Sequence, residues 1–147
     1  MSTVIKPLTG MHAERSQVYT AHLQNSLLPE LEMTRHNLMI MENDISEYEN
    51  LRGKIEELEK LDGNSIETLT EMGAGIWVEA KIPDTNVITL DLGYDLHMDM
   101  NLKEAKEYVI KKVEILKRKR DNFSKKEEFL VWQIGQFHGA LSQPDAR

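Results

Sequence analysis

Residues 66–101 alternate between apolar and polar side chains, and a long helical pattern lies on either side of them. The alternation is clearest in 76–82 and returns in 87–92 and 96–100, with a weaker run at 67–72. A period of two residues is typical of β-strands that bury one face. The apolar side chains that we expect to mediate assembly through this face are Ile76, Val78, Ile82, Ile88, Leu90, Leu92, Leu96, Met98 and Met100.

Turn-forming residues separate the four runs and predict two consecutive β-hairpins over 66–100. Gly73-Ala74-Gly75 fits a three-residue hairpin loop, and Gly93-Tyr94 fits a two-residue type II′ turn with glycine at its first central position. Pro83 begins the turn between the two hairpins. Two hairpins alone neither bury an apolar face nor pair their edges, so we expect neighbouring chains to complete the sheet.

The residues that follow the hairpins predict a helix over 102–142. Asn101, followed three residues later by Glu104, is the signature of a capping box at a helix start. From Leu102 to Leu141 the chain keeps an unbroken 4-3 spacing of mostly apolar residues, which is the pattern of a coiled-coil seam. At ~1.5 Å per residue, such a seam would extend roughly 60 Å.

A helical pattern over 12–61 precedes the hairpins, with the same 4-3 spacing from Leu27 to Tyr48. Pro29 either kinks this helix or marks its true start. Acidic residues dominate this helix and basic residues dominate 103–126, which favours antiparallel pairing of the two helices. The expected fold class is therefore mainly α: a long antiparallel coiled-coil hairpin with two β-hairpins inserted between its helices.

The length of 147 residues predicts one structural unit. We expect a disordered leader at 1–11, a single domain at 12–142 and a frayed tail at 143–147. The sequence has no cysteine, no signal-peptide pattern and no run of 18 apolar residues, which together favour a cytoplasmic location without membrane contact. The net charge of −7 argues against general nucleic-acid binding.

Residues that could carry chemistry lack supporting motifs. Asp91, Asp95, His97 and Asp99 suggest a metal site, but an exposed polar strand face explains them and no metal-binding motif accompanies them. Neither a nucleotide-binding loop nor a hydrolase motif is present. We therefore expect no catalytic, cofactor-binding or metal-binding residues and no enzymatic activity. The basic segment Lys117–Arg120 fits either a nuclear-import signal or the basic half of a charge-matched coiled coil.

The helix ends far from the hairpins carry more apolar side chains than a two-stranded pairing consumes. If the helices are antiparallel these side chains lie together, and an exposed apolar patch commonly marks a binding surface. A small cluster that packs on itself is the alternative. The candidate binding residues at these helix ends are Val18, Tyr19, Leu23, Phe129, Trp132, Phe137 and Leu141.

The order long helix, two hairpins, long helix resembles the α-class subunits of the prefoldin family. The segment Met72–Ile82 resembles the glycine turn and the hydrophobic-Val-x-Ala-x-Ile run of that family. Pro83-Asp84-Thr85, Leu92-Gly93-Tyr94 and the helix start Leu102-Lys103-Glu104-Ala105 are similar to an unconventional branch of it.

This resemblance implies a subunit of a hetero-hexamer of two α-class and four β-class prefoldin subunits, whose hairpins together form a double β-barrel platform. Such complexes hold unfolded or unassembled client proteins at the tips of their coiled coils without ATP. They pass clients to a chaperonin or, in the unconventional branch, act with an AAA+ ATPase co-chaperone in complex assembly. The resemblance also implies the nucleus as a second location. A coiled-coil scaffold for transcription co-regulation, without client holding, is the alternative.

Overall fold

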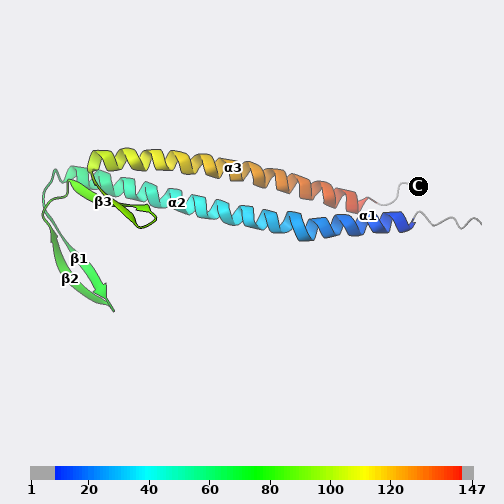
Figure 1. Cartoon of the computed structure of the whole chain (residues 1–147), viewed down its shortest axis with the longest axis horizontal. Coiled ribbons are helices and arrows are strands. Elements are labelled where there is room, and N and C mark those ends of the chain that lie inside the picture. The colour runs from blue at the N-terminus through cyan, green and yellow to red at the C-terminus, as the bar shows by residue number, and fades with distance from the viewer. Residues whose placement is uncertain (1–8, 144–147) are drawn as a thin grey trace, which may run out of the picture. The chain divides into compact units, whose positions relative to one another are not determined.

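The computed structural model describes residues 9–143, which form long helices and two β-hairpins (Figure 1). The predicted fold class, mainly α with two inserted hairpins, is confirmed. In chain order the elements are α1 (Thr9–His22), the π-helical turn η1 (Leu23–Leu27), α2 (Leu28–Lys60), β1 (Ile66–Gly73), β2 (Ile76–Ile82), β3 (Val87–Gly93), β4 (Leu96–Asn101) and α3 (Leu102–Ser142).

The expected leader and tail fall mostly on residues 1–8 and 144–147, which lie outside the described residues. Residues 9–11, which we expected to belong to the leader, are helical instead, because α1 begins at Thr9. At the other end, α3 ends at Ser142, as the sequence pattern predicted.

Two compact units make up the chain. Of the described residues, the helical-end unit contains 9–42 and 118–143, and the hairpin unit runs from Asn43 to Lys117. Helices α2 and α3 contribute residues to both units. None of the helices within residues 9–143 combines the length and the apolar character that a membrane crossing requires.

In the hairpin unit the four strands form two separate antiparallel pairs, β1 with β2 and β3 with β4. The loops differ from those we predicted: both have two residues, Ala74-Gly75 and Tyr94-Asp95, and all four of these residues have positive φ. That is the type I′ pattern, which matches the twist of the strands it joins. Gly73 and Gly93 precede the loops and lie where the strand register shifts, so each glycine forms a bulge and not the turn itself.

The helix ends of the hairpin unit anchor both hairpins. At the start of α3 the predicted capping box is confirmed: the Glu104 N–H donates to Asn101 Oδ1 at 2.8 Å, and the Asn101 N–H donates to Glu104 Oε2 at 3.4 Å. After α2, Gly63 adopts a φ of 77°, the left-handed conformation that commonly ends a helix. The buried Thr85 hydroxyl donates to the Asn64 carbonyl at 3.1 Å and so fixes the turn between the hairpins to this helix end.

Between α2 and α3 the hairpin unit contains a closed apolar seam. Ile55 and Val109 are completely buried. Ion pairs flank the seam, with Lys106 Nζ 3.3 Å from Glu59 Oε2 and Lys117 Nζ 3.3 Å from Glu49 Oε1. Since the partner number on α2 falls as the number on α3 rises, the two helices run antiparallel, as the charge pattern predicted.

The helical-end unit has its own apolar core, and every position of the predicted 4-3 seam on α3 is buried or half-buried. The predicted coiled-coil seam is therefore confirmed. The fully formed core cluster of this unit consists of Leu23, Leu27, Leu31, Leu130 and Ile134.

Pro29 does not begin the first helix, because α1 and η1 precede it. Proline has no N–H, and its ring collides with the carbonyl four residues earlier, here that of Asn25. The π turn accommodates both effects: the Leu28 N–H donates to the Leu23 carbonyl, five residues back.

The π turn also changes which side of α1 faces α3. Counted back from Leu27, a regular 4-3 spacing would place Gln24 in the seam. Because the wider turn contains an additional residue, Leu23 takes that place and is only 5% exposed, whereas Gln24 is exposed.

Candidate assembly and binding surfaces

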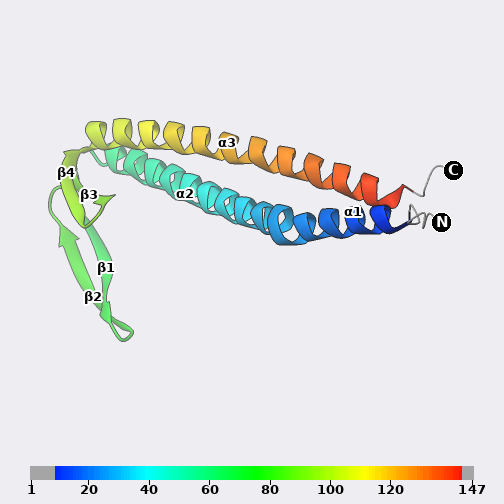
Figure 2. The ribbon, with the colours of Figure 1, turned by 45° about the vertical axis from the view of Figure 1, so that its right-hand side comes forward.

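The β1–β2 hairpin exposes the apolar face that we expected to mediate assembly. Ile76, Val78 and Ile82 alternate along β2 and are 60%, 40% and 41% exposed. Figures 1 and 2 both show this hairpin extending away from the helices of its own unit. In the described part of the chain no third strand joins this pair, so its edge N–H and C=O groups are unpaired. Such an edge beside an apolar face is a surface that further strands can extend.

The β3–β4 hairpin is covered more extensively, because it packs against the helices of the hairpin unit. Met100 lines a hollow of about 320 Å³ together with Tyr108 of α3. The predicted assembly residues of this hairpin divide between a buried or half-buried set, Ile88, Leu90, Leu92 and Met100, and an exposed set, Leu96 and Met98.

A tyrosine pair links α2 to α3 beside this hairpin. Burial, followed by the neighbouring Tyr108 phenol, raises the pKa of the Tyr48 hydroxyl above its ordinary value of 10.0. The carboxylates of Asp44 and Asp91 act in the same direction. Tyr48 is therefore neutral around pH 7 and serves as a polar contact between the helices.

The polar face of β3–β4 is engaged in local contacts. Asp91 lies opposite His97 across the two strands, and the Thr89 hydroxyl donates to Asp99 Oδ1 at 2.5 Å. Asp95 lies in the turn. No group of three His, Asp or Glu side chains within residues 9–143 is arranged to hold a metal ion.

Sequence reasoning missed the exposed turn residue of this hairpin. Tyr94 is 100% exposed and has a φ of 52°, a conformation that bulky residues rarely adopt. We predicted the loop at Gly93-Tyr94, one residue before its actual position at Tyr94-Asp95, because glycine occurs in bulges as well as in turns. No local signal in the sequence separates these two roles.

Four of the predicted binding residues at the helix ends come together within the helical-end unit. Leu23 belongs to the core cluster, and Phe137 packs against that cluster. The Tyr19 ring meets the Phe137 ring edge to face, with centroids 5.5 Å apart and an interplanar angle of 82°. Leu141 is half-buried and lines a hollow beside Tyr19. These side chains therefore pack largely on one another, while Val18 remains 64% exposed.

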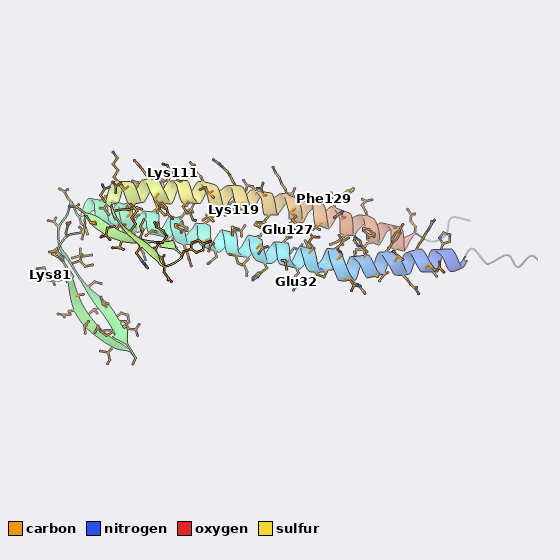
Figure 3. The ribbon with its side chains drawn as sticks, viewed as in Figure 1. Glu32, Lys81, Lys111, Lys119, Glu127 and Phe129 are labelled. Carbon is orange, nitrogen blue, oxygen red and sulfur yellow. The ribbon has the colours of Figure 1, made fainter. Side chains whose placement is uncertain are left out.

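Phe129 and Trp132 form a separate pair on α3. They lie three residues apart, so they share a helix face, and their rings stack with centroids 5.8 Å apart. Their exposed fractions are 55% and 58%. Figure 3 shows Glu127 between the helices and Phe129 on the other side of α3. The structure thus separates this pair from the residues that surround Phe137.

Two of the four residues of the basic segment are held in ion pairs. Lys117 pairs with Glu49, and Arg120 Nη2 lies 3.0 Å from Asp121 Oδ1. Arg118 and Lys119 form no ion pair with any residue that the structure describes.

A family model described as prefoldin subunit matches residues 27–146 of this sequence. The chain belongs to the prefoldin family.

Its relatives include the UXT proteins, and the chain is UXT-like within the family. It is 26% identical to protein UXT of Bos taurus over 113 residues, which cover 77% of this chain and 72% of that protein. It is 26% identical to a UXT homolog of Nematostella vectensis, covering 76% and 72% of the two chains. A UXT homolog of Dictyostelium discoideum is 30% identical over 71% of this chain and 64% of that protein.

A solved structure has the same fold. It is the cryo-EM structure of filamentous PFD from Methanocaldococcus jannaschii, with a TM-score of 0.66 and 16% sequence identity. The match covers 80% of this chain and 97% of that one.

Proposed function

We propose that the chain is a non-enzymatic subunit of a hetero-oligomeric prefoldin-like co-chaperone, assembled with other α-class and β-class prefoldin subunits. The observation that carries this proposal is the exposed apolar face of β1–β2, formed by Ile76, Val78 and Ile82 on a strand pair with open edges. A two-stranded sheet is marginal in water, and strands of neighbouring subunits would both pair its edges and cover its apolar face.

The complex would hold unfolded or unassembled client proteins at the ends of its helices. Val18, Phe129 and Trp132 expose more than half of their surface there, and Tyr19 exposes 37%. Phe137 and Leu141 would support the part of this surface around Tyr19, and Leu23 lies in the core cluster against which Phe137 packs. Each contact is weak, but several subunits acting on one client give avidity while permitting release.

The proposal includes ATP-independent action and client transfer to a chaperonin or to an AAA+ ATPase co-chaperone. The support is the resemblance to UXT-like prefoldins together with the lack of a nucleotide-binding loop in the sequence. We further propose that the protein acts in the cytoplasm, and that Lys117–Arg120 is the candidate segment for import into the nucleus.

Assembly is tested with the doubly substituted variant I76D/V78D, co-expressed with α- and β-class prefoldin subunits. Two carboxylates on the shared apolar face are expected to abolish the hetero-oligomer, measured as mass by light scattering. Leu69→Asp is the matched control, because Leu69 is 60% exposed and lies opposite Glu79, on the other face of the hairpin. A full-size complex with I76D/V78D would contradict the proposal.

Client holding is tested separately by suppression of aggregation of a denatured model protein. The V18S/W132S variant is expected to assemble normally and to suppress aggregation several-fold less well, because both side chains are exposed and contribute little to folding. The control M39S/I40S removes two exposed apolar side chains of α2. An assembled wild-type complex without any suppression would refute client holding and favour the scaffold alternative.

A further inference from the structure

The β1–β2 hairpin has a second face, opposite to the apolar face of Ile76, Val78 and Ile82. Directly opposed residues of antiparallel strands share a face, so the strand register assigns three residue pairs to it. These pairs are Glu67 with Lys81, Leu69 with Glu79, and Glu71 with Trp77. All six side chains of this charged face are exposed, Leu69 to 60% and Trp77 to 59%. The hairpin extends away from the helices of its own unit (Figures 1 and 2).

A hollow of about 810 Å³ opens on the charged face. Its lining consists of Glu67, Leu69, Glu79 and Lys81, together with Thr68 and Ala80 between them in the strands. Trp77 and Glu79 are two residues apart on β2, so the indole lies about 7 Å further along the same face. The charged face therefore offers an exposed aromatic ring beside a recess to which Leu69 contributes an apolar side.

All charged side chains of the hairpin lie on this one face, and most of them are acidic. Three glutamates, Glu67, Glu71 and Glu79, stand against the single base Lys81, which gives a net charge of −2. Lys81 lies at the end of the hairpin nearest the helices (Figure 3), about 13 Å along the strand from Trp77. None of the three carboxylates forms an ion pair with a residue that the structure describes. Even if Lys81 neutralises one of its neighbours, two carboxylates remain.

An exposed indole flanked by carboxylates is suited to binding arginine. Glu71 lies directly across from Trp77, and Glu79 lies two residues after Trp77 on the same face of the hairpin. A guanidinium group is attracted to the face of an indole ring. Because the guanidinium is planar, it can stack on the ring while its edge donates hydrogen bonds to a carboxylate. A lysine ammonium is a compact, strongly hydrated cation and lacks this stacking surface.

We propose that the charged face of β1–β2 docks an extended segment of a partner protein, in which one residue separates an arginine from an aliphatic residue. The arginine stacks on Trp77 and pairs with Glu71 and Glu79, and the aliphatic side chain enters the hollow beside Leu69. Trp77 and Leu69 are diagonal neighbours across the two strands, ~7–8 Å apart. In an extended segment, side chains two residues apart point to the same side at a spacing of about 7 Å, which matches this distance.

This inference rests on the proposed function in one respect: assembly through Ile76, Val78 and Ile82 covers the opposite face of the hairpin and leaves the charged face exposed. It goes beyond client holding, because the site lies on a hairpin and not at the helix ends, and because it recognises a particular short segment. A nucleic acid or an anionic membrane does not fit, since both the charged face and the whole chain, with a net charge of −7, repel polyanions.

The test measures the fluorescence anisotropy of three short labelled peptides in the presence of the purified hetero-oligomer that contains the full chain. The first peptide has an Arg-Thr-Leu core, the second has glutamate in place of the arginine, and the third has lysine there. The wild type is expected to bind the arginine peptide, with an affinity that falls as salt rises. It is expected to bind the lysine peptide several-fold more weakly and the glutamate peptide at least tenfold more weakly.

Four variants locate the site. E71K/E79K is expected to bind the arginine peptide at least tenfold more weakly and the glutamate peptide more tightly than the wild type does, because the sign of the charge is exchanged. W77S is expected to weaken binding of the arginine peptide several-fold, and W77F to recover part of the loss, because phenylalanine retains an aromatic ring. The control E57K/E114K makes the same change of net charge at two exposed glutamates on α2 and α3 of the hairpin unit.

Several results would overturn the docking proposal. They are equal binding of the arginine and glutamate peptides by the wild type, a lysine peptide bound as tightly as the arginine peptide, unchanged binding by E71K/E79K, or an equal loss in the control. Light scattering checks assembly in parallel. E71K/E79K and W77S are expected to form the full-size complex, and its loss would show that the charged face is a subunit contact instead. A wild-type chain that forms no complex refutes the proposed function, whereas a complete wild-type complex that does not bind the arginine peptide refutes docking alone.

Discussion

Replacing Pro29 by alanine tests what maintains the π turn before α2. Alanine restores an N–H and removes the ring that collides with the Asn25 carbonyl, so a regular α-helix becomes possible. That regular helix would gain one backbone hydrogen bond, with a net value of about 0.5–1.5 kcal/mol. If this gain decided the geometry, the π turn would disappear in Pro29→Ala.

The packing free energy that would be lost with the π turn is larger than this gain. Without the additional residue of the π turn, α1 would rotate by about 100° relative to α2. Leu23 would leave the core, which costs about 1.5–3 kcal/mol. The ring contact of Tyr19 with Phe137 would be lost as well, at about 0.5–1.5 kcal/mol. Since roughly 2–4.5 kcal/mol exceeds the hydrogen-bond gain, we expect the π turn to persist in Pro29→Ala.

Thiol labelling measures the outcome directly, because the natural sequence contains no cysteine. Leu23→Cys and Gln24→Cys are each made with Pro29 present and with Pro29→Ala. Leu23→Cys is expected to be protected and Gln24→Cys to react freely in both backgrounds, since Leu23 is buried and Gln24 is exposed. Exchange of the two reactivities in Pro29→Ala would refute the reasoning and show that proline alone imposes the turn.

Gly63→Ala is expected to destabilise the protein by about 1–2 kcal/mol in urea unfolding, because Gly63 has a φ of 77° and an added Cβ would lie 2.5 Å from Asn86 Nδ2. Gly53→Ala, in the open middle of α2, is the matched control and is expected to stabilise by about 0.5–1 kcal/mol. The raised pKa of Tyr48 means that the folded state binds the phenol proton more tightly than the unfolded state does. Its contribution to stability is therefore intact below about pH 10 and is lost as the pH rises through the folded-state pKa. Unfolding measured from pH 9 to 11.5 should show this extra alkaline loss in the wild type and not in Tyr48→Phe, and identical curves would contradict it.

The strands and helices of this protein follow from local patterns. The alternation in 76–82 specified a strand, because neighbouring side chains on a strand point to opposite faces. The 4-3 spacing from Leu102 to Leu141 specified a seam, and its positions are buried or half-buried throughout. Asn101 and Glu104 specified the start of α3, since the capping box involves residues only three apart.

Details that depend on more distant contacts were not accessible in this way. Pro29 alone did not distinguish a kink from a helix start, because the outcome depends on Leu23 packing against residues more than a hundred positions later. The two-residue loop at Tyr94 depends on which strand residue forms the bulge, and pairing across the hairpin decides that.

The same division holds for the candidate binding residues. The sequence identified an excess of apolar side chains at the helix ends, because a 4-3 seam leaves Phe129 and Trp132 without a partner. It grouped them with Phe137, since spacing records position along a helix and not the distance to a second helix. Only the tertiary structure divided them, placing Phe137 against Tyr19 and leaving Phe129 stacked on Trp132 in solvent. The sequence by itself thus determined the helices, the strands and the seam. Which surface side chains pack together and which face solvent depends on how one helix packs on another, and only the tertiary structure decided that.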